Sequence, residues 1–376
     1  MRKSLGLLSL CILSAAIASY VTWIQIRPNE HYLPDLRSQL VLNQGQPGDK
    51  GNLLGIQPEL FAADYQSPER LRLKFAAYLN KARIEGLLNS KTIVVLPEHT
   101  GTWLVASGET PEVYQAASVS DAMLWLAAGN PLQLAYALLN AQGQDRLADA
   151  LFRMKAEQMA HDYQAIFGSL AKEYGVTLVA GSIVLPAPMV RNGVLQVSDG
   201  PLYNVSQVFA SDGTALGQPQ RKVVPIIDEQ GFTAASPASA LKVVDTPAGR
   251  LGVLICADSW LPENYAALAG QHVDLLAVPA FLTGNGNWSK PWGGYNGAAT
   301  PTDVDIKPGE LTEGQAWQRM AMAGRINQGG AQAGITVFMR GQLWDLGSDG
   351  QSLIASQSQH APAAEGHGAR LINLWL

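Results

Sequence analysis

The hydrophobic pattern of the chain begins with one long apolar stretch at the N-terminus. No charged residue occurs from Ser4 to Ile26, whereas Arg2 and Lys3 precede this stretch and Arg27-Pro28 ends it. A helix of that length crosses the ~30 Å hydrocarbon core of a bilayer. Because flanking basic residues tend to stay on the cytoplasmic side, the pattern predicts a membrane anchor with the rest of the chain outside the cytoplasm.

Two other interpretations of residues 1–27 remain open. Ala16-Ile17-Ala18 has the small-x-small form of a signal-peptidase site, so cleavage there would release the protein. Leu8-Ser9-Leu10-Cys11 resembles a lipoprotein box only loosely, because a leucine before the cysteine is too bulky. Residues 28–52 are predicted to form a linker, since this part of the chain is rich in Pro, Gly, Asn and Gln.

After the linker, the apolar positions change between helical spacing and short continuous runs. Helical spacing occurs at residues 68–89, Leu151–Glu173 and Pro262–Ala269. The short runs, which predict strands, are Leu53–Ile56, Thr92–Leu96, Val176–Val184, Val205–Ala210, Leu251–Ile255, Val273–Val278 and Ile335–Met339. Strands that are apolar on both faces and alternate with helices predict an α/β fold in which helices cover a sheet.

Turn dipeptides add hairpins to this pattern. Asn192-Gly193, Asp212-Gly213 and Asp349-Gly350 each favour the positive φ angles of tight two-residue turns. The sheet is therefore expected to contain antiparallel as well as parallel pairs.

Composition and charge exclude several classes of function. Of 376 residues, 47% are hydrophobic and 15% are charged, which indicates a folded globular protein. The net charge of −5, without a basic block beyond the extreme N-terminus, argues against a nucleic-acid partner. The two cysteines, Cys11 and Cys256, are not expected to pair, because Cys11 lies in the apolar N-terminal stretch. The six histidines are scattered without zinc-ligand spacing, so no metal site is predicted.

Three polar residues follow predicted strands, where they contribute little to packing. Glu98 follows the strand at 92–96, Cys256 follows the strand at 251–255, and Lys222 follows the hairpin segment near Asp212-Gly213. In layered α/β proteins, reactive groups gather beyond the carboxyl ends of strands. A carboxylate can deprotonate a thiol for nucleophilic attack, and an ammonium can stabilise the oxyanion that forms. Each residue taken alone also has an ordinary structural explanation.

The segments around these residues resemble the carbon–nitrogen hydrolase (nitrilase) superfamily. They read LPEHTG around Glu98, RKVVP around Lys222 and GRLGVLICADSWLPENYAAL around Cys256. The resemblance implies a four-layer α-β-β-α sandwich over residues 53–376 and a Glu98-Lys222-Cys256 catalytic triad. It also implies no metal, no organic cofactor and a possible homodimer joined through the helical layer around the nucleophile.

The same resemblance suggests further site residues. Many relatives have a second glutamate shortly after the lysine, and Glu229 fits this position, with Asp228 as the alternative. The backbone N–H of Ala257 is a candidate oxyanion donor. Asp258 and Glu263 belong to the cysteine motif and are interpreted as local structural caps.

Two segments depart from the family pattern. The interval from Glu98 to Lys222 is longer than expected, and the excess occupies about residues 103–158. This insertion contains DAMLWLAAGNPLQLAYALLN, an apolar helical segment broken at Gly129-Asn130-Pro131. It is predicted to be a lid over the pocket, a surface that dips into the membrane, or a plain helical hairpin packed on the sandwich. In the glycine-rich loop 282–297, the rings of Trp288, Trp292 and Tyr295 are candidates to line a substrate pocket, with Trp288 as the candidate substrate-binding residue, although such rings can equally pin the loop.

These features predict a thiol hydrolase that cleaves an amide outside the cytoplasm through a covalent thioester. The expected substrate is a small-molecule or lipophilic amide, and the expected membrane contact is the N-terminal helix. The alternatives are a membrane-associated acyltransferase resembling apolipoprotein N-acyltransferase, a nitrile hydrolase, and a binding module without activity. The last is disfavoured because none of the three triad residues has been lost.

Overall fold

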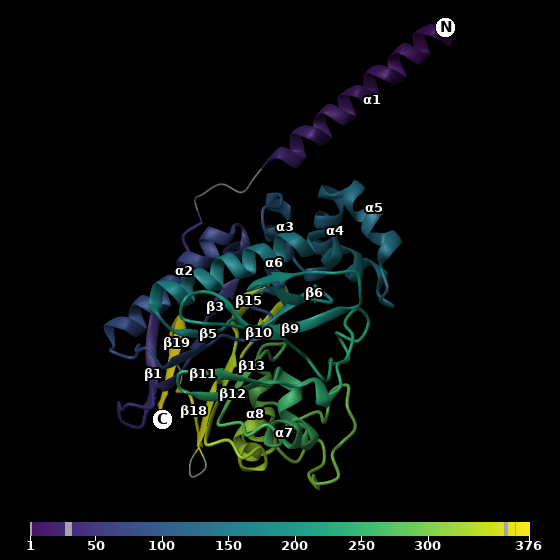
Figure 1. Cartoon of the computed structure of the whole chain (residues 1–376). Helices are drawn as coiled ribbons and strands as arrows, with labels where there is room; N and C mark the ends of the chain where they lie inside the picture. The colour runs from purple at the N-terminus through teal and green to yellow at the C-terminus, as the bar shows by residue number, and fades with distance from the viewer. Residues whose placement is uncertain (1, 27–31, 357–359, 365) are drawn as a thin grey trace.

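The computed structural model describes residues 2–26, 32–356, 360–364 and 366–376. Helix α1 (Arg2–Gln25) projects from the body of the molecule (Figure 1). In the part of the chain that the structure describes, α1 is the one unbroken helix long and apolar enough to cross a membrane, over Gly6–Gln25 with a mean hydropathy of 2.0. Arg27 and Pro28, predicted to end this helix, lie outside the described residues.

Within the described residues, the larger sheet has eight strands, in the order β1-β19-β2-β4-β5-β9-β10 with β6 paired to β9. Its strands are β1 (Ser38–Gln44), β2 (Asn52–Gln57), β4 (Thr92–Val95), β5 (Thr177–Val179), β6 (Ile183–Pro186), β9 (Leu202–Phe209), β10 (Ala215–Arg221) and β19 (Ala369–Trp375). The pairs β2–β4 and β4–β5 are parallel, whereas β5–β9 and β9–β10 are antiparallel.

The second sheet has six strands among the described residues, in the order β11-β12-β13-β14-β17-β18. They are β11 (Val243–Thr246), β12 (Gly249–Val253), β13 (Leu275–Ala280), β14 (Ala333–Phe338), β17 (Leu353–Ser356) and β18 (His360–Pro362). The central strands β12, β13 and β14 are parallel. Two small sheets complete the described strands, one of β3 (Glu59–Phe61), β15 (Arg340–Leu343) and β16 (Leu346–Ser348), the other of β7 (Met189–Arg191) and β8 (Val194–Gln196).

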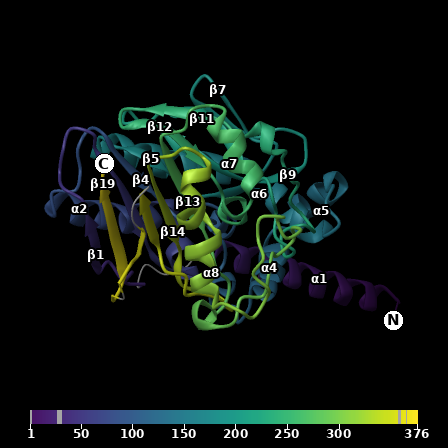
Figure 2. The same cartoon turned by 90° about the horizontal axis from the view of Figure 1, so that it is seen from below.

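The two large sheets pack face to face, and helices cover their outer faces (Figures 1 and 2). Buried side chains of β2, β4 and β5 meet those of β12, β13 and β14 in one core. At Gly55 a Cβ atom would lie 2.8 Å from Ile335, so glycine permits the close approach of the sheets. Helices α2 (Pro68–Ile84) and α6 (Arg146–Tyr174) cover the larger sheet, and α7 (Pro262–Ala269) and α9 (Met322–Arg325) pack on the other. The six-stranded sheet is also flanked by α8 (Glu313–Met320) (Figure 2).

The local sequence explains where the main helices begin and end. Ser67 caps α2 by accepting a hydrogen bond from the Arg70 N–H, and Pro68 occupies the first helical position. The Asp145 side chain caps α6 in the same way, and Gly175 ends that helix in the left-handed conformation at φ 64°. The long apolar face of α6 then packs on the sheet beside Glu98.

The insertion at residues 103–158 forms short helices between β4 and α6. After a 3₁₀ turn (Thr102–Ala106), it folds into α3 (Pro111–Gln115), α4 (Val119–Gly129) and α5 (Pro131–Asn140). Helices α4 and α5 meet at an angle of 106° at Asn130. The predicted break at Gly129-Asn130-Pro131 is confirmed, and we refer to residues 119–140 as the cap.

The predicted mixed α/β fold is confirmed, and two local predictions are wrong. Residues 38–44 of the predicted linker form β1, an edge strand that pairs in parallel with β19. Asp349-Gly350 does not form a hairpin turn, because it connects β16 and β17, which belong to different sheets. Asn192-Gly193 does form one, with both residues at positive φ.

Candidate active site

Glu98 lies just beyond the carboxyl end of β4, in a turn that contacts the segment between β5 and β6 of the same chain. The His99 N–H donates to Ser182 Oγ at 2.8 Å. At Gly181 a Cβ atom would lie 2.1 Å from the Pro97 carbonyl oxygen, so only glycine fits this close approach. The turn directs the Glu98 side chain inward, where it is 2% exposed.

The Lys222 ammonium lies between two buried carboxylates. Its Nζ donates to Glu98 Oε1 at 2.7 Å and to Glu229 Oε2. The Asn204 amide, from β9, also donates to both, at 3.0 Å to Glu98 and 2.7 Å to Glu229. These four buried side chains therefore form one hydrogen-bonded network, and Glu229 rather than Asp228 contacts the lysine.

The charges of this network stabilise one another. Burial alone would lower the pKa of Lys222, but the Glu229 and Glu98 carboxylates outweigh burial and raise the pKa well above its usual value. Burial alone would raise the pKa of Glu229, but Lys222, His99 and Asn204 together lower it. Lys222 is therefore a fixed positive charge, of the kind that stabilises an oxyanion.

Cys256 is the third residue after β12, where it begins a 3₁₀ turn (Cys256–Trp260), and it has a positive φ of 51°. A non-glycine residue rarely adopts this backbone conformation, which is common at functional turns. The buried Asp258 carboxylate holds the turn, because it accepts hydrogen bonds from the backbone N–H groups of Ile255, Val223 and Val224. Asp258 thus ties the cysteine turn to the residues that follow Lys222.

The surroundings of Cys256 keep its thiol protonated. Burial raises the pKa of this thiol, the neighbouring Glu98 carboxylate raises it further, and Lys222 opposes the increase. The net effect places the pKa well above its usual value. Because the thiolate is the nucleophilic form, the thiol needs a base at the moment of attack, and Glu98 is suitably placed to be that base.

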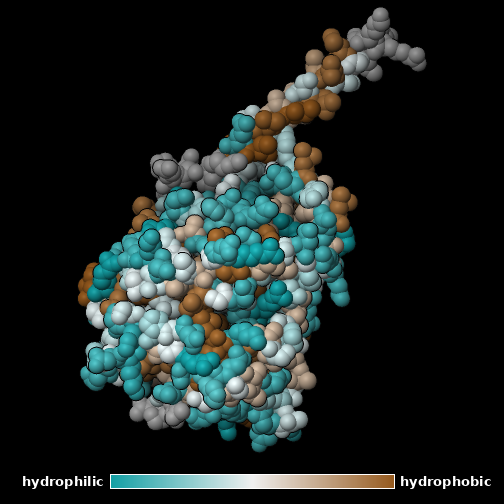
Figure 3. Space-filling model, in the orientation of Figure 1, coloured by the Kyte–Doolittle hydropathy of each residue, from teal (hydrophilic) through white to brown (hydrophobic). Residues whose placement is uncertain are grey.

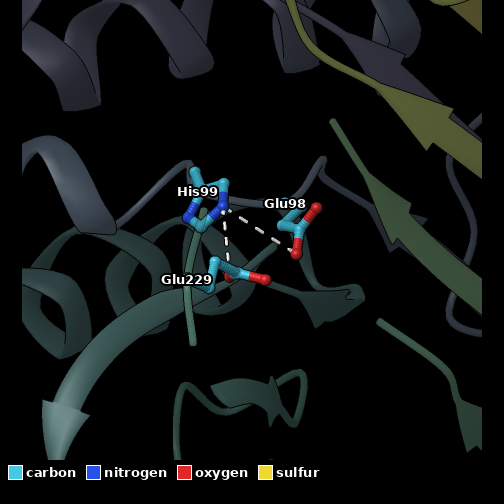
Figure 4. Close-up of side chains that lie close together, drawn as sticks. All are labelled: Glu98, His99 and Glu229. Carbon is cyan, nitrogen blue, oxygen red and sulfur yellow. Dashed lines mark ion pairs between the residues drawn. The ribbon is translucent and has the colours of Figure 1, made fainter. Parts of the chain in front are cut away.

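His99 is an additional titratable group in the site. Its Nε2 lies 3.6 Å from Glu229 Oε1 and 3.9 Å from Glu98 Oε1 (Figure 4). Ligand atoms of these three residues lie within 4.8 Å of one another, a spacing that can hold a metal ion. The Lys222 ammonium already contacts both carboxylates, however, which argues against a second cation there.

Two cavities meet near the network. The first, of about 580 Å³, is lined by Cys256 and Ala257 and by the rings of Trp260, Trp292 and Tyr295; we call it the aromatic cavity. The second, of about 500 Å³, is lined by Glu98, Glu229 and His99 and by apolar side chains of the cap and α6; we call it the cap cavity. Ile226, Asp228, Phe281 and Thr283 line both.

The structure brings most of the predicted site residues together. Ala257 lines the aromatic cavity beside Cys256. Trp288 lines neither cavity; its ring packs edge-on against Phe338 with centroids 5.5 Å apart, so it pins the loop. The other two predicted rings, Trp292 and Tyr295, do line the aromatic cavity. Glu263 is exposed in the first turn of α7, which fits its interpretation as a helix-start residue.

Sequence reasoning missed Asn204, His99 and Phe281. The Cys256 Sγ atom is 3.6 Å from the Phe281 carbonyl oxygen, and the His99 and Phe281 rings are 5.8 Å apart. Strand β9 also contains the buried polar residues Ser206 and Gln207, so its sequence does not single out Asn204.

The chain is similar to known carbon–nitrogen hydrolases over part of its length. A family model described as carbon-nitrogen hydrolase matches residues 147–299. The chain is 30% identical over 142 residues to an omega-amidase of Xenopus laevis. This match covers 35% of this chain and 48% of the relative. It is 31% identical over 129 residues to the deaminated glutathione amidase of Yersinia enterocolitica, which covers 32% of this chain and 42% of the relative. The chain thus spans less than half the length of these two curated relatives.

A likeness to solved structures extends over more of the chain. The amidase from Nesterenkonia sp. AN1, in a form with acrylamide added at its active-site cysteine, matches with a TM-score of 0.51. The match covers 87% of this chain and 93% of the other, at 14% sequence identity. At that identity the similarity establishes a shared fold.

Proposed function

Because the chain belongs to the carbon–nitrogen hydrolase superfamily, we propose that it hydrolyses a non-peptide amide bond with Cys256 as nucleophile. One observation carries the proposal: the buried Cys256 thiol lies beside the buried Glu98 carboxylate, which accepts a hydrogen bond from the Lys222 ammonium. Because the relatives include amidases, we favour amide hydrolysis over acyl transfer.

The reaction begins with transfer of the thiol proton to Glu98. The Cys256 sulfur attacks the carbonyl carbon, and the carbonyl π electrons move to oxygen. The Lys222 ammonium and the Ala257 N–H stabilise this oxyanion. When the oxyanion collapses, the carbon–nitrogen bond breaks, and the proton on Glu98 passes to the departing amine.

The second half of the reaction removes the acyl group from sulfur. Glu98, again ionised, accepts a proton from water while the water oxygen attacks the thioester carbon. Collapse of the second tetrahedral intermediate releases a carboxylic acid and returns the proton to sulfur. Glu229 and Asn204 keep Lys222 and Glu98 in place throughout.

The experiment that tests the proposal is an assay of the purified full-length protein against primary amides, with ammonia release as the readout. We expect turnover in the native protein, none in Cys256→Ala, and unchanged turnover in Cys11→Ala. Activity in Cys256→Ala would refute the thiol mechanism.

We also propose that α1 anchors the chain in a membrane, with the catalytic domain on the non-cytoplasmic side. Support comes from the uncharged window of α1 and from Arg2 and Lys3 at its start. An anchored protein stays in the membrane pellet after alkaline carbonate extraction, whereas a soluble protein with a mature N-terminus near Ser19 would indicate a cleaved signal. The homodimer stays a prediction, which light scattering of the detergent-solubilised protein tests.

A further inference from the structure

The cap has apolar side chains on its outer surface. In α5, Leu132, Tyr136 and Leu139 are 83%, 72% and 81% exposed. Their spacing of four and three residues places them on one face of the helix. The chain has no charged residue from Ala122 to Gln144, which is unusual for exposed helices. Figure 3 shows apolar residues near the end of the body from which α1 projects.

Helix α1 contacts the cap directly, and it also contacts the preceding helix α3, which contains Glu112. The Tyr20 hydroxyl donates to the Ala128 carbonyl oxygen at 2.8 Å, and the Trp23 indole N–H donates to Glu112 at 2.9 Å. The rings of Trp23 and Trp125 have centroids 6.0 Å apart. Tyrosine and tryptophan at the end of a membrane helix lie at the level of the lipid headgroups. The contact therefore sets Trp125 and the cap at that same level.

The cap cavity connects this surface with the catalytic network. Leu124 is 58% exposed on the outside and also lines the cavity. The lining also includes the apolar side chains of Met123, Leu151 and Phe152, together with Glu98 and Glu229 of the catalytic network. An apolar chain that enters beside Leu124 thus has a mostly apolar path to the reacting groups.

We propose that the cap lies on the bilayer that holds α1 and that the cap cavity receives the acyl chain of an amide dissolved in that bilayer. A bilayer is the partner proposed for the exposed apolar face of the cap, because the proposed membrane anchor α1 contacts the cap. The membrane contact of the cap depends on the anchor, whereas the choice of substrate rests on the proposed hydrolase function.

The membrane contact is tested with the full-length protein in phosphatidylcholine–phosphatidylglycerol vesicles, with and without brominated acyl chains. Leu139→Trp adds a fluorophore to the cap, and Ile84→Trp adds one at an 80% exposed position at the end of α2. We expect brominated lipid to quench at least about half of the emission added at position 139 and little of that added at position 84. Equal quenching at both positions would overturn the membrane contact.

The substrate assignment is tested with two amides that share the amine and differ by four methylene groups in the acyl chain. Each methylene that becomes buried favours binding roughly fourfold, so kcat/KM should favour the longer amide by more than about a hundredfold. Met123→Trp narrows the cavity and should lower this ratio at least about tenfold, whereas Ile84→Trp should not change it.

The possible failures are distinguishable. If native protein cleaves neither amide, the proposed hydrolase function fails, while the quenching result still decides the membrane contact. If it cleaves both with equal kcat/KM, or if Met123→Trp keeps the native ratio, the cap cavity is not the acyl site and the hydrolase function stands.

Discussion

Replacing Lys222 by methionine removes the one ammonium between two buried carboxylates. At an effective dielectric constant of ~20, a single ion pair at the 2.7 Å separation of Lys222 and Glu98 is attracted by about 6 kcal/mol before desolvation is counted. Removal of one partner of a buried pair usually costs about 3–5 kcal/mol of stability. The loss of an oxyanion donor slows catalysis by at least about a hundredfold. We therefore expect Lys222→Met to lose both stability and rate.

The variant should also gain a pH dependence of stability in addition to that of the native protein. Native Glu229 has a lowered pKa, so its stabilising contribution is present above the ordinary value of 4.5 and is lost only at lower pH. Without Lys222, Glu98 and Glu229 cannot both stay ionised, and one takes up a proton in the folded state. The folded variant then binds one more proton than the unfolded chain. Its free energy of unfolding therefore falls as pH rises, by about 1.4 kcal/mol per pH unit relative to the native protein.

The assay is denaturant unfolding of both proteins between pH 5 and 7.5, together with amide turnover per folded molecule. Lys74→Met is the matched control, because Lys74 is fully buried and its Nζ lies 2.6 Å from Asp64 Oδ2, outside the site. This control should lose comparable stability and keep its rate per folded molecule. If Lys222→Met also keeps its rate, Lys222 is structural. If the unfolding free energy of Lys222→Met follows the pH dependence of the native protein, Glu98 and Glu229 do not need Lys222 in order to stay ionised.

Three further changes test separate parts of the site. Asn204→Leu should lower kcat/KM about tenfold or more, because hydrogen bonds to charged groups contribute ~1.5–3 kcal/mol. An unchanged kcat/KM would mean that the hydrogen bonds of Asn204 to Glu98 and Glu229 do not contribute to catalysis. Trp292→Leu should raise KM while Trp288→Leu lowers only the melting temperature, and the reverse result would contradict the assignment of the aromatic cavity. Burial raises the pKa of Asp258 from 3.8 to about 7, so its contribution to stability is present at low pH and is lost as pH rises through 7. Asp258→Asn should remove that decline in melting temperature, and a persistent decline would point to another group.

The sequence predicted elements whose patterns are local. Helix α7 has the predicted bounds, and α2 begins at the predicted Pro68, because a capping residue and a proline mark its start. Glu98, Lys222 and Cys256 were predicted from their positions after strands or a hairpin segment together with the resemblance of the surrounding segments to the family, and the structure places Glu98 and Cys256 just beyond β4 and β12.

The missed features depend on contacts between distant parts of the chain. Strand β1 is recognisable only through its pairing with β19, near the other end of the sequence. Asn204 contacts Glu98 from 106 positions away, which no local pattern reveals. Trp288 and Trp292 lie in one loop, and packing against Phe338 rather than composition decides which ring faces the cavity.

The proposed mechanism requires a thioester at Cys256. Rapid acid quenching of the native protein during turnover of a primary amide, followed by peptide mass spectrometry, measures this intermediate. We predict that the peptide with Cys256 gains the mass of the acyl group, that the peptide with Cys11 does not, and that Cys256→Ala gives neither adduct nor ammonia. Steady ammonia release from Cys256→Ala, or an acyl group found on a residue other than Cys256, would contradict the mechanism.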